Sequence, residues 1–386
     1  MRETYIDSSE DLNALCKQFA TAEWLTLDTE FIRETTYYPR LCLIQIADDE
    51  TAACIDPLAI NDLGPLHELL MNTRITKVLH AASQDMEIFY YLWGELPKPV
   101  FDTQPAAALA GLGDQIGYAN LVHGLTGVEL AKGHSRTDWS KRPLDTAQIR
   151  YALDDVIHLR EVYLKLRDRL RDAGRLEWLT ADAFDTLVST ETYRIEPLDI
   201  WQRTKGWQKL KGVQLAILQQ LAAWREETAR KQDRPRGRIL KDDLLVEICR
   251  RKPRNIDQLG KLRGIDRGFL RRHGEHLVAL IEKALALPES DWPRHPRMHI
   301  KPTPQQQALA DLMQCLVRLK GQQHQIAPAS LAARKELEAV ASGDRDLSVL
   351  KGWKREIVGD ALLRLAEGRL QLRVDDQGKV SMQEDQ

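Results

Sequence analysis

Short apolar runs alternate with polar, turn-forming residues in the first half of the chain. Four of these runs carry β-branched residues and have the length of β-strands: WLTLDTEF (24–31), RLCLIQIAD (40–48), TAACIDP (51–57) and ITKVLHA (75–81). The first three follow one another closely, which favours antiparallel neighbours. Helical periodicity is present in DMEIFYYLW (85–93) and in TAQIRYALDDVIHLREVYLKLRDRL (146–170). The pattern therefore predicts an α/β sandwich with a mixed sheet flanked by helices.

The second half of the chain has a helical pattern. The stretch ETYRIEPLDIWQRTKGWQKLKG (191–212) has no sustained helical period, and four prolines interrupt SDWPRHPRMHIKPTP (290–304). Two helical blocks of similar length and layout follow these stretches, which suggests a duplicated helical module. We predict an α/β domain at 1–190, a linker at 191–205, a helical block at 206–290, a linker at 291–302, a helical block at 303–376 and a tail at 377–386.

The composition is that of a soluble protein with a sizeable core, because 43% of its 386 residues are hydrophobic and 29% are charged. The start, MRETYIDSSEDL, has no apolar signal core, and no stretch approaches the roughly 18 apolar residues that a membrane span needs. The five cysteines are scattered without a C-x-x-C pair, which argues against a zinc site or a disulfide framework. We therefore expect a cytoplasmic protein with no membrane partner.

The net charge of −2 conceals a division of charge along the chain. Residues 1–190 carry a net −12, residues 201–300 a net +11, and residues 301–386 a net +1. A basic segment of this kind is typical of a protein that holds a polyanion. The alternative is that the opposite charges only help the domains to dock. The charge pattern alone does not choose between these two interpretations.

Two carboxylates end the first strand. Asp28 and Glu30 are two residues apart, so they point to the same face of a strand, whereas Leu25 and Leu27 point to the other. Ionised carboxylates this close repel each other, and protonation or a cation must relieve the repulsion. Mg²⁺ and Mn²⁺ prefer oxygen ligands and suit such a pair. The pair could also be a solvated strand end.

Two further positions carry candidate chemistry. Asp85 lies just past the strand at 75–81, in the first turn of a helix, where an acid also favours the helix dipole. Tyr151 and Asp155 are four residues apart on the long helix and so share one face, which a local hydrogen bond alone could explain. Taken singly, each of these residues has such an ordinary structural explanation.

In combination the motifs are specific. LDTEF (27–31), HAASQD (80–85) and YALDDV (151–156) closely resemble the three exonuclease motifs of the DEDD superfamily, and the Y-x-x-x-D spacing resembles its tyrosine branch. TYYPRLCLIQIAD, IDPL, GELPKPVFDTQ and HSRTDWSKRPL resemble the ribonuclease D family. The helical blocks are similar to HRDC domains, which LKGWKREIVGDALL (350–363) supports for the second block. The resemblance covers nearly the whole chain.

The resemblance implies a ribonuclease H-like exonuclease domain with a mixed sheet, followed by two all-α HRDC domains. The family hydrolyses the 3′-terminal phosphodiester and releases 5′-mononucleotides, with two divalent ions, Mg²⁺ or Mn²⁺, in the active site. By this resemblance Asp28 lies between the two ions, Glu30 and Asp155 complete the shell of the first, and Asp85 holds the second. Tyr151 matches the residue that positions the attacking water, and its unperturbed pKa near 10 makes it a poor base.

Substrate contacts follow less directly. Arg136 is expected to bind a phosphate and Trp139 to stack on a base, because stacking is a common grip on unpaired RNA. Arg136 could equally be a surface ion-pair partner, and Trp139 a core residue. Phe31 is expected near the terminal base, and Arg33 and His80 near the scissile phosphate. His273 and His276 lack an acid or cysteine at ligand spacing, so we do not expect them to bind metal.

The leading hypothesis is a monomeric 3′→5′ exoribonuclease that acts on RNA, in particular on the 3′ ends of tRNA precursors. The basic block at 206–290 would hold the body of the RNA, whereas the nearly neutral block at 303–376 has no evident RNA-binding role. One alternative is a DNA-directed 3′→5′ exonuclease. Another is a catalytically inactive nucleic-acid-binding protein, which the presence of all five motif residues disfavours.

Overall fold

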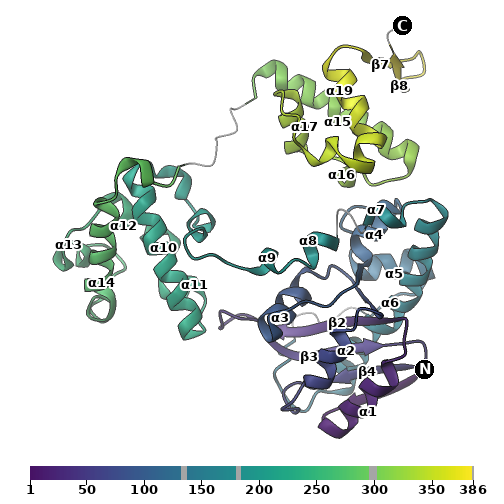
Figure 1. The fold of residues 1–386 in the computed structure, drawn as a ribbon, viewed down its shortest axis with the longest axis horizontal. Helices are drawn as coiled ribbons and strands as arrows, with labels where there is room; N and C mark the ends of the chain where they lie inside the picture. The colour runs from purple at the N-terminus through teal and green to yellow at the C-terminus, as the bar shows by residue number, and fades with distance from the viewer. Residues whose placement is uncertain (132–136, 180–183, 295–301, 385–386) are drawn as a thin grey trace. The chain divides into compact units, whose positions relative to one another are not determined.

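The protein is described by a computed structural model that covers residues 1–131, 137–179, 184–294 and 302–384. Its internal contacts divide the chain into two compact units (Figure 1). Unit 1 contains Met1–Phe31, Leu41–Thr192 and Lys301–Gln386, and unit 2 contains Ile32–Arg40 and Tyr193–Ile300. In the described part of the chain, no helix combines the length and the hydropathy that crossing a lipid bilayer requires.

A six-stranded mixed sheet forms the centre of unit 1. Its strand order is β1-β4-β3-β2-β5-β6, with β3 antiparallel to β4, and with parallel pairs β1–β4, β2–β5 and β5–β6. The strands are β1 (Arg2–Ile6), β2 (Trp24–Ile32), β3 (Arg40–Ala47), β4 (Thr51–Ile55), β5 (Thr76–Leu79) and β6 (Val100–Asp102). The predicted mixed sheet is therefore confirmed. The two edge strands, β1 and β6, were not predicted, because one is polar and the other has only three residues.

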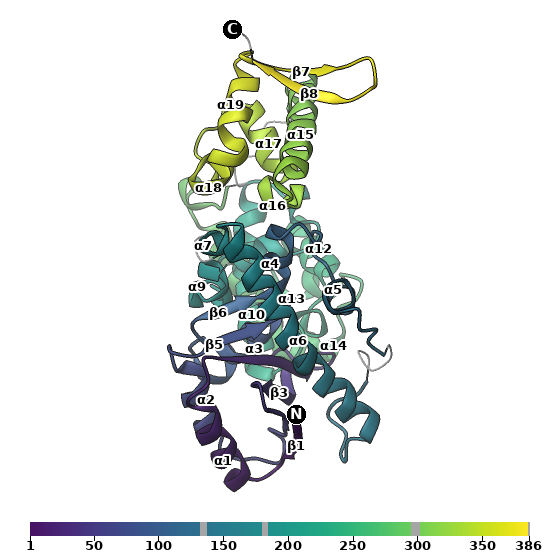
Figure 2. The same ribbon diagram turned by 90° about the vertical axis from the view of Figure 1, so that its right-hand side faces the viewer.

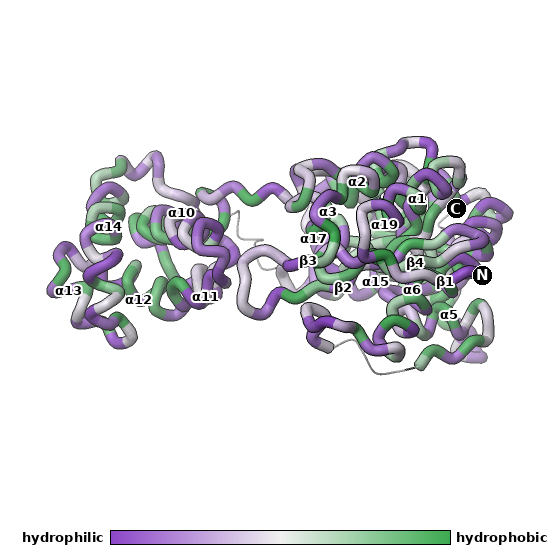
Figure 3. Tube along the Cα trace, turned by 90° about the horizontal axis from the view of Figure 1, so that it is seen from below, coloured by the Kyte–Doolittle hydropathy of each residue, from purple (hydrophilic) through white to green (hydrophobic). Residues whose placement is uncertain are grey.

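Helices pack around this sheet (Figure 2), and hydrophobic stretches run along its strands (Figure 3). The longest is α6 (Thr146–Asp172), which begins with a capping box between Asp145 and Gln148 and buries Leu153, Val156 and Leu159. The other helices are α1 (Ser9–Phe19), α2 (Gly64–Met71), α3 (Ser83–Trp93), α4 (Thr103–Leu109), α5 (Tyr118–Thr126), α7 (Leu176–Leu179), α8 (Asp185–Leu187) and α9 (Thr190–Tyr193). The helix α6 and the sheet together position the site described below.

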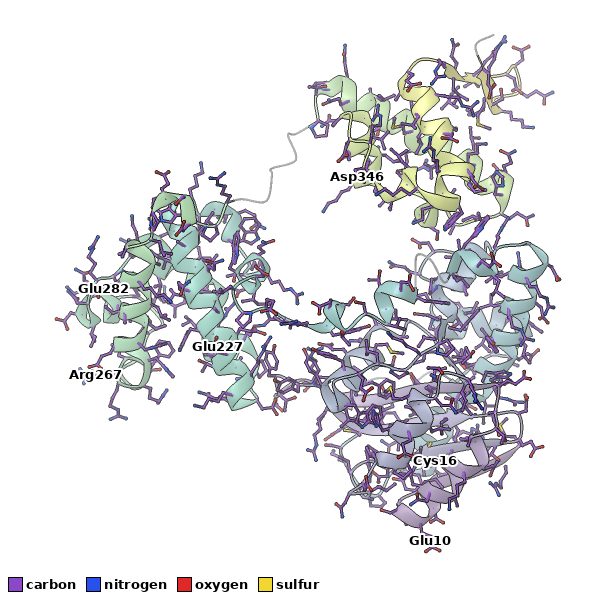
Figure 4. All side chains as sticks on the ribbon, in the orientation of Figure 1. Glu10, Cys16, Glu227, Arg267, Glu282 and Asp346 are labelled. Atoms are coloured by element: carbon purple, nitrogen blue, oxygen red, sulfur yellow. The ribbon has the colours of Figure 1, made fainter. Side chains whose placement is uncertain are left out.

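The C-terminal block is a small helical bundle that ends in a hairpin. It contains α15 (Pro304–His324), α16 (Pro328–Leu331), α17 (Arg334–Ala341), η5 (Ser348–Leu350), α18 (Gly352–Lys354), the π-helix η6 (Arg355–Gly359), α19 (Asp360–Ala366), β7 (Leu370–Val374) and β8 (Val380–Glu384). β7 and β8 pair in antiparallel register, so residues 380–384 of the predicted tail at 377–386 form a strand. Asp346, which lies between α17 and η5 of this block, is exposed and forms an ion pair with Lys351 at 2.5 Å (Figure 4).

This block is joined to the rest of unit 1 by specific contacts. The Trp178 and Trp353 rings stack with centroids 4.7 Å apart and planes 2° from parallel. The backbone N–H of Ala327 donates to the carbonyl of Ala108 at 3.0 Å, and Arg175 donates to the carbonyl of His324. These contacts bury apolar surface and satisfy backbone groups, which favours a structural role for the block.

Unit 2 is helical. It contains η2 (Ile200–Arg203), η3 (Trp207–Lys209), α10 (Val213–Gln232), α11 (Arg236–Ile239), α12 (Asp242–Arg251), α13 (Ile256–Gly260), α14 (Arg267–Leu285) and η4 (Glu289–Asp291). Ile200 and Trp201 are buried in the same core cluster as residues of α10, α12 and α14. The predicted linker at 191–205 is therefore wrong at its C-terminal end. A short 3₁₀ turn has too few residues for a helical period, yet it can bury an indole ring.

The loop between β2 and β3 also belongs to unit 2. The hydroxyl of Tyr37 donates to the carboxylate of Glu226, and the Asp233 carboxylate accepts hydrogen bonds from the backbone N–H groups of Tyr37 and Tyr38 at 3.0 and 3.1 Å. Tyr37 is 7% exposed. The loop that directly follows the Asp28–Glu30 strand is thus packed against α10.

Candidate active site

Three carboxylates converge where β2 meets α6. Asp28 and Glu30 lie on β2, and Asp155 lies on α6. Each offers an oxygen, and these three oxygens all lie within 4.8 Å of one another. The predicted convergence of β2 with the long helix is therefore present in the structure.

The pKa values of these carboxylates lie above their ordinary range. Burial raises the pKa of Asp28 well above its ordinary range, and the nearby charges of Asp155, Asp85 and Glu30 raise it further. Burial, followed by the charges of Asp155 and Asp85, raises the pKa of Glu30 to about 8. Burial, followed by the charge of Asp154, raises the pKa of Asp155 to about 7. Like charges held together in this way favour protonation or a bound cation.

Asp85 lies beside this group but outside it. It is 7% exposed in the first turn of α3, and one of its oxygens accepts a hydrogen bond from the Thr29 hydroxyl at 2.5 Å. Burial raises its pKa to about 7, although the Thr29 hydrogen bond opposes this increase. Its charge still raises the pKa values of Asp28 and Glu30, so the four carboxylates share one electrostatic environment.

Tyr151 lies on α6 one turn before Asp155. Burial raises the pKa of its phenol, and the charges of Asp155, Glu30 and Asp28 raise it further. A phenol with a raised pKa stays protonated at neutral pH, so Tyr151 can orient a water molecule but is a poor base. This agrees with the orienting role that the sequence resemblance implies.

A pocket of about 550 Å³ opens beside the carboxylates. Its lining includes Asp28, His80, Tyr118, Tyr151 and Asp155. Burial lowers the pKa of His80 to about 4, so the imidazole is neutral at pH 7. His80 thus lines the same pocket as Asp28, and its contact with the scissile phosphate stays a prediction. Its Nδ1 lies 3.0 Å from the Thr103 hydroxyl.

The other predicted substrate residues differ in their exposure and in where they lie in the structure. Trp139 is 2% exposed, and its ring centroid lies 6.1 Å from that of Tyr151, so the prediction that it stacks on a base is wrong. The indole packs behind Tyr151, and a buried ring has no free face to offer. Phe31 is half-buried on β2, and Arg33 is exposed in the loop of unit 2. Arg136 lies outside the described residues.

Sequence reasoning missed an ion pair that supports this region. The guanidinium of Arg142 donates to both oxygens of Asp56 at 2.6 and 2.7 Å, and to the carbonyl oxygens of Trp139 at 2.8 Å and Cys42 at 2.6 Å. Arg142 therefore fixes the segment that carries Trp139 against β3 and the end of β4. The signal was present in IDPL and SKRPL, but the sequence does not indicate that these stretches meet.

Comparison with known proteins agrees with this geometry. The family model described as 3′-5′ exonuclease matches residues 4–171, and the model described as HRDC domain matches residues 214–281. A mixed sheet with an acidic cluster, followed by a helical HRDC region, defines a 3′→5′ exonuclease with an appended helical domain. The HRDC character of the block at 303–376 remains a prediction.

Individual relatives specify the family. Ribonuclease D of Granulibacter bethesdensis is 42% identical over 96% of this chain and 94% of its own, and that of Gluconacetobacter diazotrophicus is 41% identical over 96% and 94%. The crystal structure of Escherichia coli RNase D, described as an exoribonuclease involved in structured RNA processing, superposes with a TM-score of 0.82 at 35% identity, covering 95% of this chain and 99% of that one. The chain belongs to the ribonuclease D family of 3′→5′ exoribonucleases.

The donor set fits the divalent metal use that this family implies. Three carboxylate oxygens within 4.8 Å of one another are hard ligands at the spacing of a shared cation. Burial and mutual repulsion raise the pKa values of these groups, and a divalent cation would remove that repulsion. The residues on β2 and α6 are therefore suited to hold a metal ion.

Proposed function

We propose that this chain removes nucleotides one at a time from the 3′ end of RNA and releases 5′-mononucleotides, with two divalent ions, Mg²⁺ or Mn²⁺, held by its four carboxylates. The observation that supports this proposal is the convergence of Asp28, Glu30 and Asp155, with Asp85 alongside. Partly buried carboxylates that lie close together and have raised pKa values are typical of a site that binds a cation.

Each residue has a distinct part in this proposal. Asp28, Glu30 and Asp155 hold one ion, and Asp85, which lies outside their group, serves the second together with Asp28. When bound, the ions lower the pKa of a water molecule and stabilise the leaving 3′-oxygen. Tyr151 donates a hydrogen bond from its phenolic hydroxyl and so orients that water, since its raised pKa keeps the hydroxyl protonated.

The helical unit supplies the affinity for the RNA body. Residues 201–300 carry a net +11. One hollow of about 720 Å³ in unit 2 has a lining with five basic residues and two acidic ones, which are Arg234, Arg238, Lys241, Arg263, Arg272, Asp243 and Asp266. Arg267, at the start of α14, is also exposed (Figure 4). Phosphate contacts of this kind are independent of sequence and weaken with salt. We propose that the substrates are structured RNAs, in particular tRNA precursors with 3′ extensions, processed in the cytoplasm by a monomer.

A time course on a 3′-extended tRNA, with and without Mg²⁺ or Mn²⁺, tests this function. The expected result is metal-dependent loss of single 3′ nucleotides that appear as 5′-monophosphates. A matched DNA oligomer and an RNA with a blocked 3′ end serve as controls. A higher rate on DNA than on RNA would favour the DNA-directed alternative. Binding of RNA without turnover in any divalent metal would favour an inactive binding protein.

A further inference from the structure

The strand that carries Asp28 and Glu30 has a threonine hydroxyl on each face. Thr26 and Thr29 are three residues apart on β2, so they point to opposite faces of the strand. Both are buried, with exposures of 0% and 6%. A buried hydroxyl needs a hydrogen-bond partner, and each of these finds one on a helix rather than only within the sheet.

Thr26 connects β2 to the helix that carries Asp155. Its hydroxyl lies 3.0 Å from the carbonyl oxygen of Val156, which is the residue after Asp155, and 3.3 Å from that of Ala47 on β3. Thr26 precedes Asp28 by two residues and shares its strand face. This hydrogen bond therefore fixes α6 along β2 one residue away from a proposed ligand.

Thr29 connects β2 to the carboxylate on the other helix. Its hydroxyl donates directly to Asp85 at 2.5 Å. Because the hydroxyl has one proton, and that proton is used here, the bond orients one Asp85 oxygen in addition to the backbone hydrogen bonds that this carboxylate accepts. The strand is thus tied from one face to α6 and from the other to α3.

We propose that Thr26 and Thr29 are positioning residues, which hold the carboxylates of α6 and α3 at the correct separation from Asp28 and so set the affinity of the site for its metal ions. The inference rests on the proposed metal-dependent function of this site. Residues that orient metal ligands typically change metal affinity or activity by about 10- to 100-fold when they are removed. Neither threonine belongs to the predicted set of site residues.

Direct Mn²⁺ binding tests the proposal without relying on turnover. Thr26→Val and Thr29→Val remove a hydroxyl with little change in shape, and we expect each to weaken Mn²⁺ binding by about tenfold in calorimetry or electron paramagnetic resonance. Thr26→Ser and Thr29→Ser, which keep the hydroxyl, should restore the affinity. The Mn²⁺ concentration that gives half-maximal activity should increase, whereas KM for RNA at saturating Mn²⁺ should change little.

Thr51→Val is the matched control. Thr51 is a buried threonine on β4 of the same sheet, at 2% exposure, and its hydroxyl accepts a hydrogen bond from Gln18 at 2.9 Å. It should lose stability like the other valine variants but keep the Mn²⁺ affinity of the wild type. The proposal is overturned if either Thr26→Val or Thr29→Val, folded by its metal-free melting curve, binds Mn²⁺ like the wild type. Failure of RNA cleavage in the wild type would refute the proposed function, while the binding comparison would still decide the role of the threonines.

Discussion

Asp28 and Asp56 are aspartates of the same sheet in opposite electrostatic environments. Asp56 follows β4 directly, is 3% exposed, and is paired with Arg142 and with the hydroxyl of Tyr5 at 2.6 Å. Burial alone would raise the pKa of Asp56, but the hydrogen bonds from Arg142 and Tyr5 outweigh it and lower the pKa below its ordinary value. Asp28 has carboxylates as neighbours instead, and its pKa is raised.

Burial favours the protonated form of both carboxylates, but only Asp56 has a cationic partner that outweighs this effect. When a buried carboxylate faces a guanidinium, the protein itself compensates its charge. Removing the carboxylate then leaves the charge of the guanidinium uncompensated. A partly buried carboxylate that faces other carboxylates needs a proton or a cation to compensate its charge. The first arrangement supports the fold, whereas the second is expected to cost stability until an ion binds.

The largest expected effect concerns Asp28 and Asp155, which face other carboxylates. Asp28→Asn and Asp155→Asn should each reduce turnover of a short 3′-hydroxyl RNA by at least about 10³-fold, because losing a ligand removes several kcal/mol of charge stabilisation. RNA binding by the basic helical unit should be retained. Turnover and RNA binding are measured separately. Asp172→Asn, an exposed acid at the end of α6, is the control and should behave like the wild type. Turnover retained in both site variants would disprove the catalytic assignment.

The next largest effect concerns the ion pair between Asp56 and Arg142. Asp56→Ala leaves the Arg142 guanidinium without its carboxylate and should lower the free energy of unfolding by about 3 kcal/mol. Urea unfolding of the metal-free protein measures this loss. The intrinsic Mn²⁺ affinity of the folded variant should change little by comparison, since Asp56 is not among the grouped carboxylates. An unchanged unfolding midpoint would show that the ion pair does not support the fold.

Tyr151→Phe should have a smaller effect on catalysis. It keeps the ring against Trp139 but removes the hydroxyl, so kcat should fall by about 10- to 100-fold through a less well oriented water. Mn²⁺ binding and the melting temperature should stay near those of the wild type. A variant with unchanged kcat at saturating RNA would assign the orientation of the water to another group.

The last prediction concerns how the free energy of unfolding depends on pH. The two kinds of carboxylate contribute opposite dependences, each with a slope below about 1.4 kcal/mol per pH unit for one group. Glu30, with a pKa of about 8, and Asp155, with a pKa of about 7, bind protons more tightly in the folded protein than in the unfolded chain. The metal-free protein should therefore lose stability as the pH rises from about 4 to about 8. Asp56 has a lowered pKa, so its contribution is present above about pH 4 and is lost on acidification.

Melting curves at several pH values, with and without Mn²⁺, measure this prediction. Protons compete with the metal for the same carboxylates, so stabilisation by Mn²⁺ should increase from pH 5 to pH 8. Asp155→Asn removes one of the repelling charges and should reduce the loss of metal-free stability at high pH. A metal-free stability that increases steadily up to pH 8 would contradict the raised pKa values.

The sequence predicts the local features of this site well. The alternation of apolar and polar positions around Asp28 and Glu30 places both acids on one strand face, and the four-residue spacing of Tyr151 and Asp155 places them on one helix face. The approach of β2 to α6 did not follow from either pattern. It was inferred only because the three motifs together resemble a known family.

Other features depend on contacts between distant segments and have no local pattern. The pair of Asp56 and Arg142 joins residues 86 positions apart. Burial of Trp139 behind Tyr151 and of Trp201 in the helical core depends on neighbours that a window of sequence does not contain. The hairpin of β7 and β8 is a different case, because LQLRV and VSMQE do alternate apolar and polar residues, but each strand has only five residues and is largely exposed.

The position of Tyr37 affects how this chain can be shortened. The loop at 32–40 packs against α10, and the Tyr37 phenol contacts both Glu226 and Arg230. A fragment that stops at residue 190 would retain every carboxylate of the candidate site. It would, however, remove the partners of the buried Tyr37 side chain, which lies five positions beyond the end of β2. Such a fragment should be cut first by proteases within this loop, and studies of the isolated nuclease part need residues up to at least the end of α10.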